Sequence, residues 1–593
     1  MQLTIIDWII IALYFLFNFG IGWYFRKRAT SSMSDFFVSG RNVSWWLAGT
    51  SMVATTFAAD TPLAVTGLVA RNGIAGNWIW WSMAFSGMLT VFVYAKLWRR
   101  AGVLTDVEFA EIRYSGKPAT FLRGFRALYL GLPINLIILG WVNLAMVKIL
   151  SLILGIGKVE ALGIALLMMV ITASISTLSG LWGVLWTDLF QFVLKMGMVI
   201  ALAIFAVNAS GGLAGLKQGL LDVDAHRSAT GSVLSFLPDL HSTWMPMITF
   251  FVFIAVNWWA SWYPGAEPGG GGYVAQRIFS AKDEKNSILA TLWFNVAHYA
   301  LRPWPWILVA LVAVVRYQND PAFAADPESG YVRVLISDLP AYLRGLMIAA
   351  FAAAYMSTVG TQLNWGASYL VSDLYKRFMQ KNKSDKHYVK AAQLTTVLLM
   401  VCSAVVTYFM GSIAGAWKFM IALGAGTGLV YILRWFWWRI NAWSEISAMA
   451  AAFVVSTSMQ YLFHLDESNP KDFAYIVLIT VACTTAIWML VTFLTDPEPH
   501  DTLIAFYRRV RPNAALWGPI AKEATDVIPR KDGFFNIMDW LCGVFMIYAF
   551  LFGAGQIILG STVLGFVLLA GGLALGAVIY SDLNRRGWAT VGE

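Results

Sequence analysis

The sequence predicts an all-α polytopic membrane protein, and three observations support this fold class. Hydrophobic residues make up 59% of the 593 residues, whereas only 13% are charged. Average soluble domains contain about 25% charged residues. Aromatic residues reach 15%, including 28 tryptophans. Because a spanning helix needs about 20 apolar residues, roughly 15 helices of about 25 residues each would account for the apolar share.

About fifteen apolar segments, each long enough to cross a membrane, follow one another along the chain. We expect them at 4–25, 44–70, 76–98, 122–150, 160–179, 182–207, 244–262, 287–315, 342–373, 388–411, 415–438, 445–464, 473–495, 534–556 and 560–582.

The distribution of basic residues predicts which side of the membrane each loop occupies. The cluster Arg26-Lys27-Arg28 follows the first apolar segment, whereas a cleaved signal peptide carries its charges first. We therefore interpret 4–25 as a spanning helix. Since loops rich in Lys and Arg face the cytoplasm, the chain is expected in the plasma membrane with its N-terminus outside and its C-terminus cytoplasmic. The basic loops are Arg26 to Arg28, Lys96 to Arg100, Arg277 to Lys285, Lys376 to Lys386, Arg508 to Arg511, and Arg585-Arg586.

Other function classes find little support in the composition. The net charge of +9 is interpreted as an orientation signal and not as a nucleic-acid surface. The three cysteines lie in apolar segments and the six histidines are scattered, which predicts neither a disulfide framework nor a metal or catalytic site. The loops at 208–243, 316–341 and 496–533 are too short for a soluble catalytic domain. We expect no enzyme and no obligate protein partner.

Polar residues interrupt three of the apolar segments. At membrane depth, polar side chains and irregular backbone survive only where protein or a watery cavity surrounds them. Discontinuous helices in two halves of a chain indicate a secondary transporter, and their free carbonyls with nearby hydroxyls suit a hard cation. The interrupting residues are Thr55, Thr56, Asp60, Thr61 and Pro62 in the second segment, Asn257 in the seventh, and Ser357, Thr358, Thr361 and Asn364 in the ninth.

A series of ordered motifs resembles the sodium:solute symporter family, whose members include sodium/glucose cotransporters. The most specific match is Ala353-Ala354-Tyr355-Met356-Ser357-Thr358, followed by Leu363-Asn364 and Asp373-Leu374-Tyr375. Similar motifs are Asp35-Phe36-Phe37 through Gly40-Arg41 with Trp45-Trp46, Leu185 to Gln191, and Gln276-Arg277 with Ser280 to Glu284. The resemblance runs from about residue 5 to about residue 440.

This resemblance implies an inverted-repeat core of five plus five helices, with one spanning helix before it and about four after it. The expected divisions are 1–43 for the N-terminal helix and first inner loop, 44–207 for the first repeat, 208–243 for an outer loop, 244–438 for the second repeat, and 439–593 for additional helices with the inner loop 496–533.

The resemblance also implies sodium-coupled symport of a small organic solute, with sodium as the co-transported ion. Asp188 matches an acidic residue near the sodium exit path. A second sodium site of some members has Gly360 where a hydroxyl would be needed, so one ligand is missing. The implied sodium ligands are the carbonyls of Ala54, Phe57 and Ala354 with the hydroxyls of Ser357 and Thr358.

The solute is expected to be a sugar or a sugar derivative. Tryptophans at 80, 81, 258, 259 and 262 offer stacking faces, although such residues also serve as packing or interfacial anchors. Aligned with a galactose-carrying relative, the contact positions are Thr61, Trp80, Met83, Asn257 and Asn295, of which only Asn257 keeps its residue type.

Charged residues keep alternatives open. Arg302, inside the eighth segment, could bind the carboxylate of an amino acid or organic acid. Lys195 lies seven residues after Asp188 and could act as a built-in cation that shifts coupling toward protons. Asp60 could neutralise a cationic solute or pair with a neighbouring helix. The glycine-rich insertion 264–272 reads as a flexible connector or as an inner-gate hinge. A transporter-like solute sensor is the non-transport alternative.

Overall fold

The computed structural model describes the chain except for residues 1–2, 30–37, 227–230, 264, 529–531 and 589–593. Within helices, the side chains at 27–29, 176–180, 385–386, 389 and 423 are also outside the description. The motif Asp35-Phe36-Phe37 and the first residue of the glycine-rich insertion therefore lie outside the described residues. In the remaining chain, the one β-like pairing is an isolated bridge between Val43 and Ala281.

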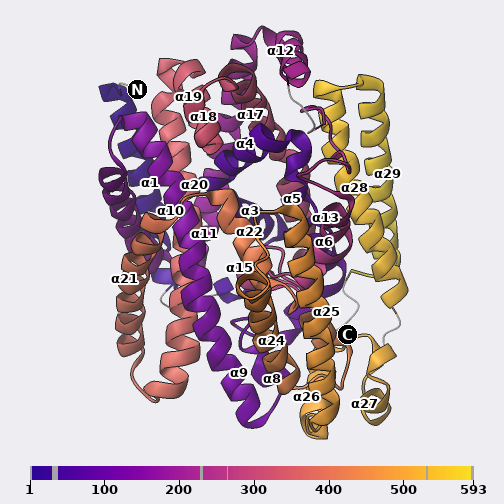
Figure 1. Ribbon diagram of the computed structural model, residues 1–593. Helices are drawn as coiled ribbons and strands as arrows, with labels where there is room; N and C mark the ends of the chain where they lie inside the picture. Colours follow the sequence, from indigo (N-terminus) through magenta and orange to yellow (C-terminus); the bar gives the residue numbers. More distant parts are fainter. Residues whose placement is uncertain (1–2, 30–37, 227–230, 264, 529–531, 589–593) are drawn as a thin grey trace.

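The described residues are folded almost entirely into helices (Figure 1). Those of the first part are α1 (Ile5–Ala29), α3 (Trp45–Thr56), α4 (Asp60–Asn72), α5 (Trp78–Trp81), α6 (Ala84–Leu89), α7 (Ala95–Ala101), α8 (Phe109–Arg113), α9 (Gly116–Tyr129), α10 (Asn135–Leu154), α11 (Lys158–Ala209) and α12 (Gly212–His226).

Those of the second part are α13 (Met247–Phe251), α14 (Trp258–Ala260), α15 (Gly272–Ser280), α16 (Glu284–Val296), α17 (Pro303–Tyr317), α18 (Pro321–Ala325), α19 (Gly330–Asp338), α20 (Arg344–Ser368), α21 (Asp385–Phe409), α22 (Ile413–Gly424), α23 (Gly428–Phe436), α24 (Ala442–Tyr461), α25 (Pro470–Leu494), α26 (His500–Val510), α27 (Gly518–Glu523), α28 (Gly533–Leu559) and α29 (Thr562–Arg585).

The predicted number of about fifteen spans is not confirmed. By length and composition, 11 helices of the described chain could cross a membrane, or 12 if the bent pair α3 and α4 forms one span. The three other predicted segments correspond to shorter or more polar pieces. The segment 244–262 holds short helices over Met247–Ala260, 415–438 is divided between α22 and α23, and α24 fills 445–464.

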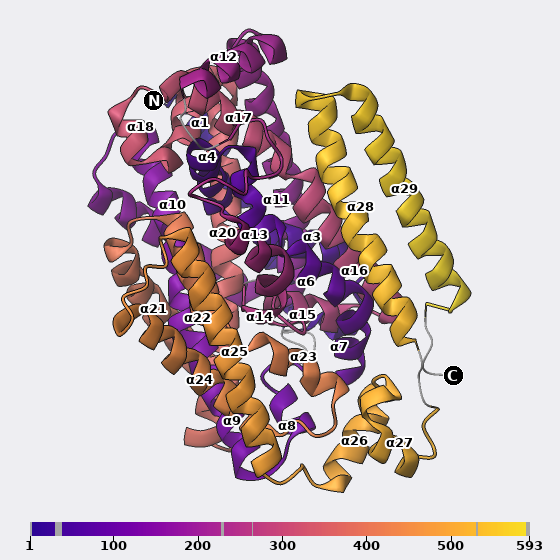
Figure 2. The ribbon, with the colours of Figure 1, turned by 45° about the vertical axis from the view of Figure 1, so that its right-hand side comes forward.

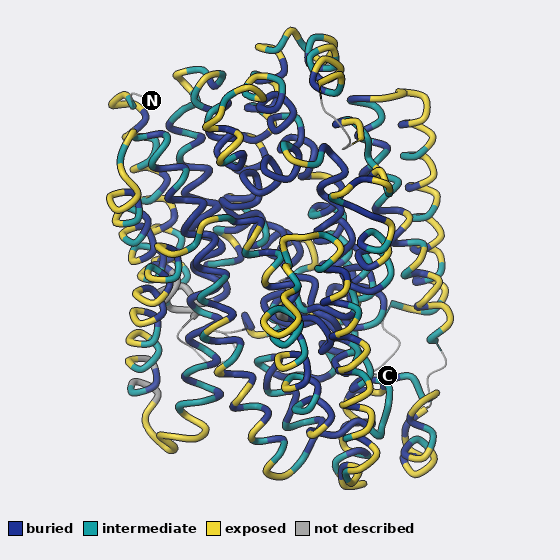
Figure 3. The backbone as a smooth tube through the Cα atoms, viewed as in Figure 1, coloured by how far each residue is buried: buried dark blue, intermediate teal, exposed yellow. Residues whose placement is uncertain are grey.

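The helices form a bundle whose centre is shielded from lipid. Figure 3 shows the central segments mostly buried, while the outer helices such as α29 carry many exposed positions. The exposed side chains of α29 are apolar, with Val563 75% and Leu573 68% exposed, as expected of a surface that faces lipid tails. Figure 2 shows α28 and α29 as a pair at one edge, and they also pack against each other. Near the centre, α3 packs against α11, α16 and α20.

The long connections lie at the two ends of the bundle. In Figure 1, α1 begins at the same upper end as α12 and α18, whereas α8, α9, α26 and α27 lie at the lower end. The described parts of the loops 208–243 and 316–341 are thus on the side where α1 begins, and the described part of 496–533 is on the other. This grouping agrees with the predicted alternation of the loops.

The second predicted segment is a broken helix, as the sequence indicated. The axes of α3 and α4 differ by 58° across the break, and Phe57 leaves helical geometry with φ −91° and ψ 68°. Pro62 has no N–H to donate to the carbonyl of Ala58, so a helix cannot continue through this point without losing a hydrogen bond. The carbonyls of Val53 and Ala54 still accept the Phe57 N–H, at 3.0 and 3.2 Å, but the last carbonyls of a helix keep lone pairs that can bind further groups.

Glu328 joins three elements beside α4. Its carboxylate accepts hydrogen bonds from the N–H groups of Ile413 and Ala414, both at 3.1 Å, and from the Ser412 hydroxyl at 3.2 Å. It therefore caps the N-terminus of α22, where helix N–H groups lack partners and favour negative charge. Lys148 on α10 donates to the same carboxylate at 2.6 Å. Glu328 is 2% exposed, so these partners compensate a buried charge.

Replacing Glu328 with alanine should destabilise the fold, because it leaves the first N–H groups of α22 and the Lys148 ammonium without this partner. We expect a loss of about 3–5 kcal/mol, measured as a lower midpoint of thermal unfolding in detergent. Asp326→Ala is the matched control, since Asp326 binds the same lysine at 2.8 Å but is 43% exposed; it should change the midpoint little. Equal shifts in the two variants would contradict the capping role.

Candidate cation and solute site

Hydroxyl groups of α20 bind the free carbonyls at the end of α3. The Ser357 hydroxyl donates to the Ala54 carbonyl at 3.0 Å. The Thr358 hydroxyl bonds the Thr55 carbonyl at 2.8 Å and that of Ala354, one turn back in its own helix, at 3.2 Å. All of these residues are buried. The structure thus brings together, across two elements about 300 residues apart in sequence, the oxygens from which the sequence predicted a sodium site.

The ammonium of Lys195 also lies at these carbonyls. Its Nζ donates to the Ala54 carbonyl at 2.8 Å and to the Phe57 carbonyl at 3.1 Å, and it lies 5.1 Å from the centre of the Phe57 ring. Lys195 is on α11 and is 1% exposed. Two carbonyls that are predicted to bind sodium, those of Ala54 and Phe57, therefore accept hydrogen bonds from a lysine in this structure.

A second group of hydrogen-bonded polar side chains, centred on Ser51, connects α3, α11, α15 and α20. Ser51 donates to the Asp188 carboxylate at 2.6 Å and accepts from the Arg277 guanidinium at 3.2 Å. Arg277 and Asp188 approach to 3.9 Å, with both side chains 1% exposed. Arg277 also donates to the hydroxyls of Thr55 and Thr361, at 3.4 and 3.2 Å. Asp188, predicted on the sodium path, is thus held by an arginine and a serine.

A third cation, Arg302, reaches the same end of α3 from the start of α17. Its guanidinium donates to the Val53 carbonyl at 3.4 Å and to the Thr56 hydroxyl at 3.1 Å. It also contacts the His298 ring, one of whose nitrogens lies 3.0 Å from the same hydroxyl. Among the described residues no carboxylate lies within ion-pair distance of Arg302. The C-terminal end of a helix carries partial negative charge, which explains why three cations gather at the end of α3.

A cavity opens beside the break, and Arg302 lines it. Two of the five predicted solute residues, Thr61 and Trp80, line this cavity with Asp60. Asp60 is 3% exposed and its Oδ1 has no hydrogen-bond partner among the described residues. The other lining residues are Thr55, Thr56, Ala58, Ile138, Trp141, Val142, Tyr263, Tyr273, His298, Thr358, Gln362 and Trp417.

Met83, Asn257 and Asn295, the other predicted solute residues, do not line this cavity. Asn295 donates to the carbonyls of Gly87 and Thr291 at 3.3 and 2.8 Å and so joins α6 to α16. Met83 and Asn257 are fully buried. Neither polar atom of the Asn257 amide has a hydrogen-bond partner among the described residues.

Most of the predicted stacking tryptophans are also used in packing. Trp258 stacks on Phe85 with ring centres 5.5 Å apart, and Trp262 lies against Gly424. Trp80 stacks on Tyr299 with ring centres 5.9 Å apart, and it also lines the cavity. The indoles of Trp141 and Trp417 also line the cavity, and the sequence did not single them out, because only the fold brings these distant helices together.

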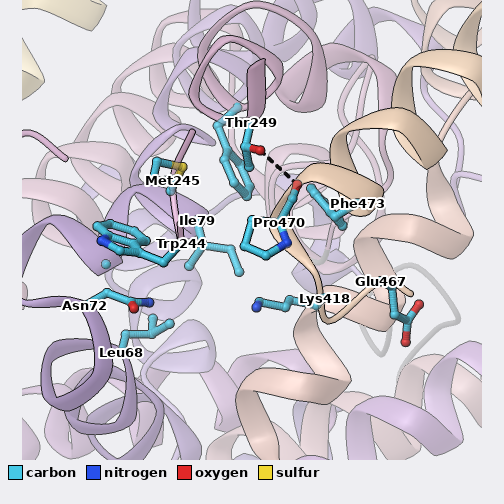
Figure 4. Close-up of a pocket in the computed structure, with 12 residues that line it drawn as sticks. Leu68, Asn72, Ile79, Trp244, Met245, Thr249, Lys418, Glu467, Pro470 and Phe473 are labelled. Atoms are coloured by element: carbon cyan, nitrogen blue, oxygen red, sulfur yellow. Dashed lines mark hydrogen bonds between the residues drawn. The ribbon is translucent and has the colours of Figure 1, made fainter. Parts of the chain in front are cut away.

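Figure 4 shows the lining of a second cavity, which does not include Trp417. Lys418, the next residue on α22, borders it together with Leu68, Trp244 and Glu467. Thr249 donates to the Pro470 carbonyl at 2.8 Å across one wall. None of the predicted sodium or solute residues borders this cavity, so the candidate solute site remains beside the helix break.

The glycine-rich insertion is packed inside the protein. Residues 265–272 are buried, and the Trp98 indole donates to the Gly269 carbonyl at 2.9 Å. Gly270 has φ +68°, and a side chain there would lie 2.8 Å from Trp98, so only glycine suits the position. This packing does not favour a flexible connector, whereas a hinge at the inner gate stays a prediction.

Comparison with known proteins identifies the relatives of this chain. Residues 36–452 match the model of the sodium:solute symporter family. The chain belongs to the sodium:solute symporter family. It is 25% identical to a sodium/glucose cotransporter of Vibrio parahaemolyticus over 84% of this chain and 92% of the relative. It is 23% identical to a high-affinity proline transporter of Bacillus subtilis over 72% and 86% of the two chains.

A solved structure shares the fold. A Na⁺-coupled sialic acid symporter, in a substrate-bound outward-open state, aligns with a TM-score of 0.66 and 20% identity over 84% of this chain and 99% of its own. The all-α transporter fold is therefore confirmed, apart from the number of spans. The family match also confirms a multi-pass membrane transporter that couples a small organic solute to sodium as the co-transported ion.

Replacing Arg277, which donates to Ser51 and faces Asp188, should destabilise the protein, because it takes from the buried Asp188 carboxylate the cation that lies 3.9 Å away. We expect Arg277→Ala to cost about 3–5 kcal/mol, measured by thermal unfolding in detergent. The double variant Arg277→Ala/Asp188→Asn should recover part of this loss, since the uncompensated charge is gone. A double variant no more stable than Arg277→Ala would show that the two charges do not interact.

Proposed function

We propose that this chain is a plasma-membrane symporter for a sugar or a sugar derivative, driven by sodium. The observation that carries the solute class is the lining of the cavity beside the helix break. Indoles of Trp80, Trp141 and Trp417 border it, and aromatic faces suit the apolar faces of sugar rings. Asp60 and Gln362 on its walls offer acceptors and donors for hydroxyl groups.

Sodium is proposed to bind at the carbonyls of Ala54, Phe57 and Ala354 and the hydroxyls of Ser357 and Thr358. Hard monovalent cations favour such neutral oxygens. Because Ala54 and Phe57 end α3 while the hydroxyls belong to α20, bound sodium would hold the broken helix against α20. Solute would then enter the adjacent cavity, which Thr358 also borders. Loss of sodium toward Asp188 would release both.

One sodium per solute supplies enough free energy for uptake. A membrane potential of 100 mV contributes about 2.3 kcal/mol per charge, and a tenfold sodium gradient adds about 1.4 kcal/mol. The sum of about 3.7 kcal/mol corresponds to roughly 500-fold accumulation of solute.

The proposed topology places the N-terminus outside and the C-terminus in the cytoplasm. The positive-inside rule supports it, as does the position of α26, with Arg508 and Arg509, at the end opposite the start of α1 (Figure 1). Within the family fold, we assign 44–207 and 244–438 to the two five-helix repeats. The break of α3 would lie in the first repeat and α20 in the second.

A second candidate solute is an amino acid or organic carboxylate. Arg302 borders the cavity without a carboxylate partner among the described side chains, and a guanidinium can bind a carboxylate with two hydrogen bonds. Asp60, on the same walls, could receive the ammonium of an amino acid.

Truncating the α20 hydroxyls should weaken sodium binding while leaving the fold intact. We expect Ser357→Ala and Thr358→Ala each to raise the half-saturating sodium concentration by about tenfold or more, since each removes one neutral ligand and about 1.4 kcal/mol or more of binding. Sodium-jump currents of proteoliposomes on a solid-supported membrane measure this. Ser368→Ala, near the end of the same helix and bonded to the Trp365 carbonyl, is the control. We call the proposed sodium ligands, namely the Ala54, Phe57 and Ala354 carbonyls with these two hydroxyls, the cage. An unchanged sodium response in both variants would contradict it.

The solute class follows from the same recordings with a panel of sugars, sugar acids, amino acids and simple carboxylates, in sodium and then in potassium buffer. We expect sodium-dependent currents with sugars or sugar acids. Currents with amino acids or carboxylates alone would favour the second candidate. In that case Arg302→Lys, which keeps the charge but loses the planar fork, should weaken solute binding by about tenfold or more.

A further inference from the structure

The ammonium of Lys195 occupies the position at which the proposed sodium site is centred. It shares the Ala54 carbonyl with the Ser357 hydroxyl and takes the Phe57 carbonyl as its second acceptor. The Ala54 carbonyl also accepts the Phe57 N–H at 3.2 Å, so its two lone pairs are shared among three donors. The lysine therefore does more than lie near the cage, because its ammonium is hydrogen-bonded to two of the oxygens that would bind sodium.

A sodium ion and this ammonium cannot share the cage. Both would bind the same two oxygens, and like charges a few ångströms apart repel strongly where water is excluded. The charged groups around Lys195 do not offset this repulsion. Asp188, on its own helix, is bound to Ser51 and faces Arg277, while Arg302 adds another positive charge at the Val53 carbonyl.

The lysine can leave the cage without unfolding the site. Its side chain has a flexible four-carbon stem, whereas Arg277 and Arg302 are each held by several acceptors. Asp188 lies seven residues earlier, about 10.5 Å along the axis of an α-helix. The carboxylate is thus a nearby counter-charge for a displaced ammonium.

We propose that Lys195 is a tethered cation that fills the cage between sodium-binding events and that sodium binds by displacing it. This inference rests on the proposed sodium site and adds a competitor to it. With the lysine in place, the carbonyls of Ala54 and Phe57 keep a cationic partner after sodium leaves, so that α11 remains bonded to the break in the empty carrier. The apparent sodium affinity is lowered by the fraction of time that the lysine holds the cage.

Lys195→Met tests the competition, because it keeps most of the apolar stem and removes the charge. Sodium binding is measured at one fixed pH as stabilisation of the purified protein against heat, with potassium keeping the ionic strength constant. We expect the half-saturating sodium concentration to fall by about tenfold or more. Lys195→Arg, which keeps a cation on the tether, should not show this fall. Lys158→Met, at an exposed lysine that donates to the Tyr408 carbonyl, should match the parent protein.

The outcomes separate this inference from the sodium site itself. A sodium affinity that is unchanged or lower in Lys195→Met overturns the tethered cation, because the lysine would then only crosslink α11 to the break. Melting in potassium alone verifies that the variant is folded. If neither the parent protein nor Lys195→Met responds to sodium, while both melt cooperatively, the sodium site fails and the inference with it. A response in Lys195→Met alone supports displacement by showing that the lysine blocks the parent site.

Discussion

The free carbonyls at the end of α3 are the constraint on which the centre of this protein depends. A helix that stops inside a membrane protein leaves backbone oxygens without partners, in surroundings where water cannot satisfy them. Here the partners come from three other helices, namely the hydroxyls of α20, Lys195 of α11 and Arg302 of α17. The break thus organises the packing around it, and it also creates the group of oxygens that a transported cation requires.

Charge at the break is unevenly distributed. Lys195, Arg277 and Arg302 approach the end of α3, while Asp188 is the carboxylate bound into the same network. The negative end of the helix dipole offsets part of this excess. A site already rich in positive charge holds an additional cation weakly unless one of the resident cations moves. This consideration links the position of Lys195 to the proposed mechanism of sodium coupling.

The sequence predicted the break and its partners better than the solute cavity. Asp60, Thr61 and Pro62 interrupt an apolar run, and the hydroxyls of Ser357 and Thr358 sit at membrane depth, so both parts of the cage could be found from residue types. Helical spacing placed Lys195 on the face of Asp188, but it could not give the side-chain conformation that takes the ammonium to Ala54 and Phe57. Trp141 and Trp417 carry no sequence signal because tryptophan is frequent throughout the chain. Alignment to a distant relative gave Thr61 and Trp80 as cavity residues, whereas Asn295 proved to hold two helices together.

Equilibrium binding of radioactive sodium to the purified, solute-free protein tests the central claim most directly. A helix break that forms a single cage predicts one saturable sodium site per chain, with no competition from potassium at equal concentration. Binding that does not saturate, or that potassium abolishes, would contradict a sodium site at the end of α3.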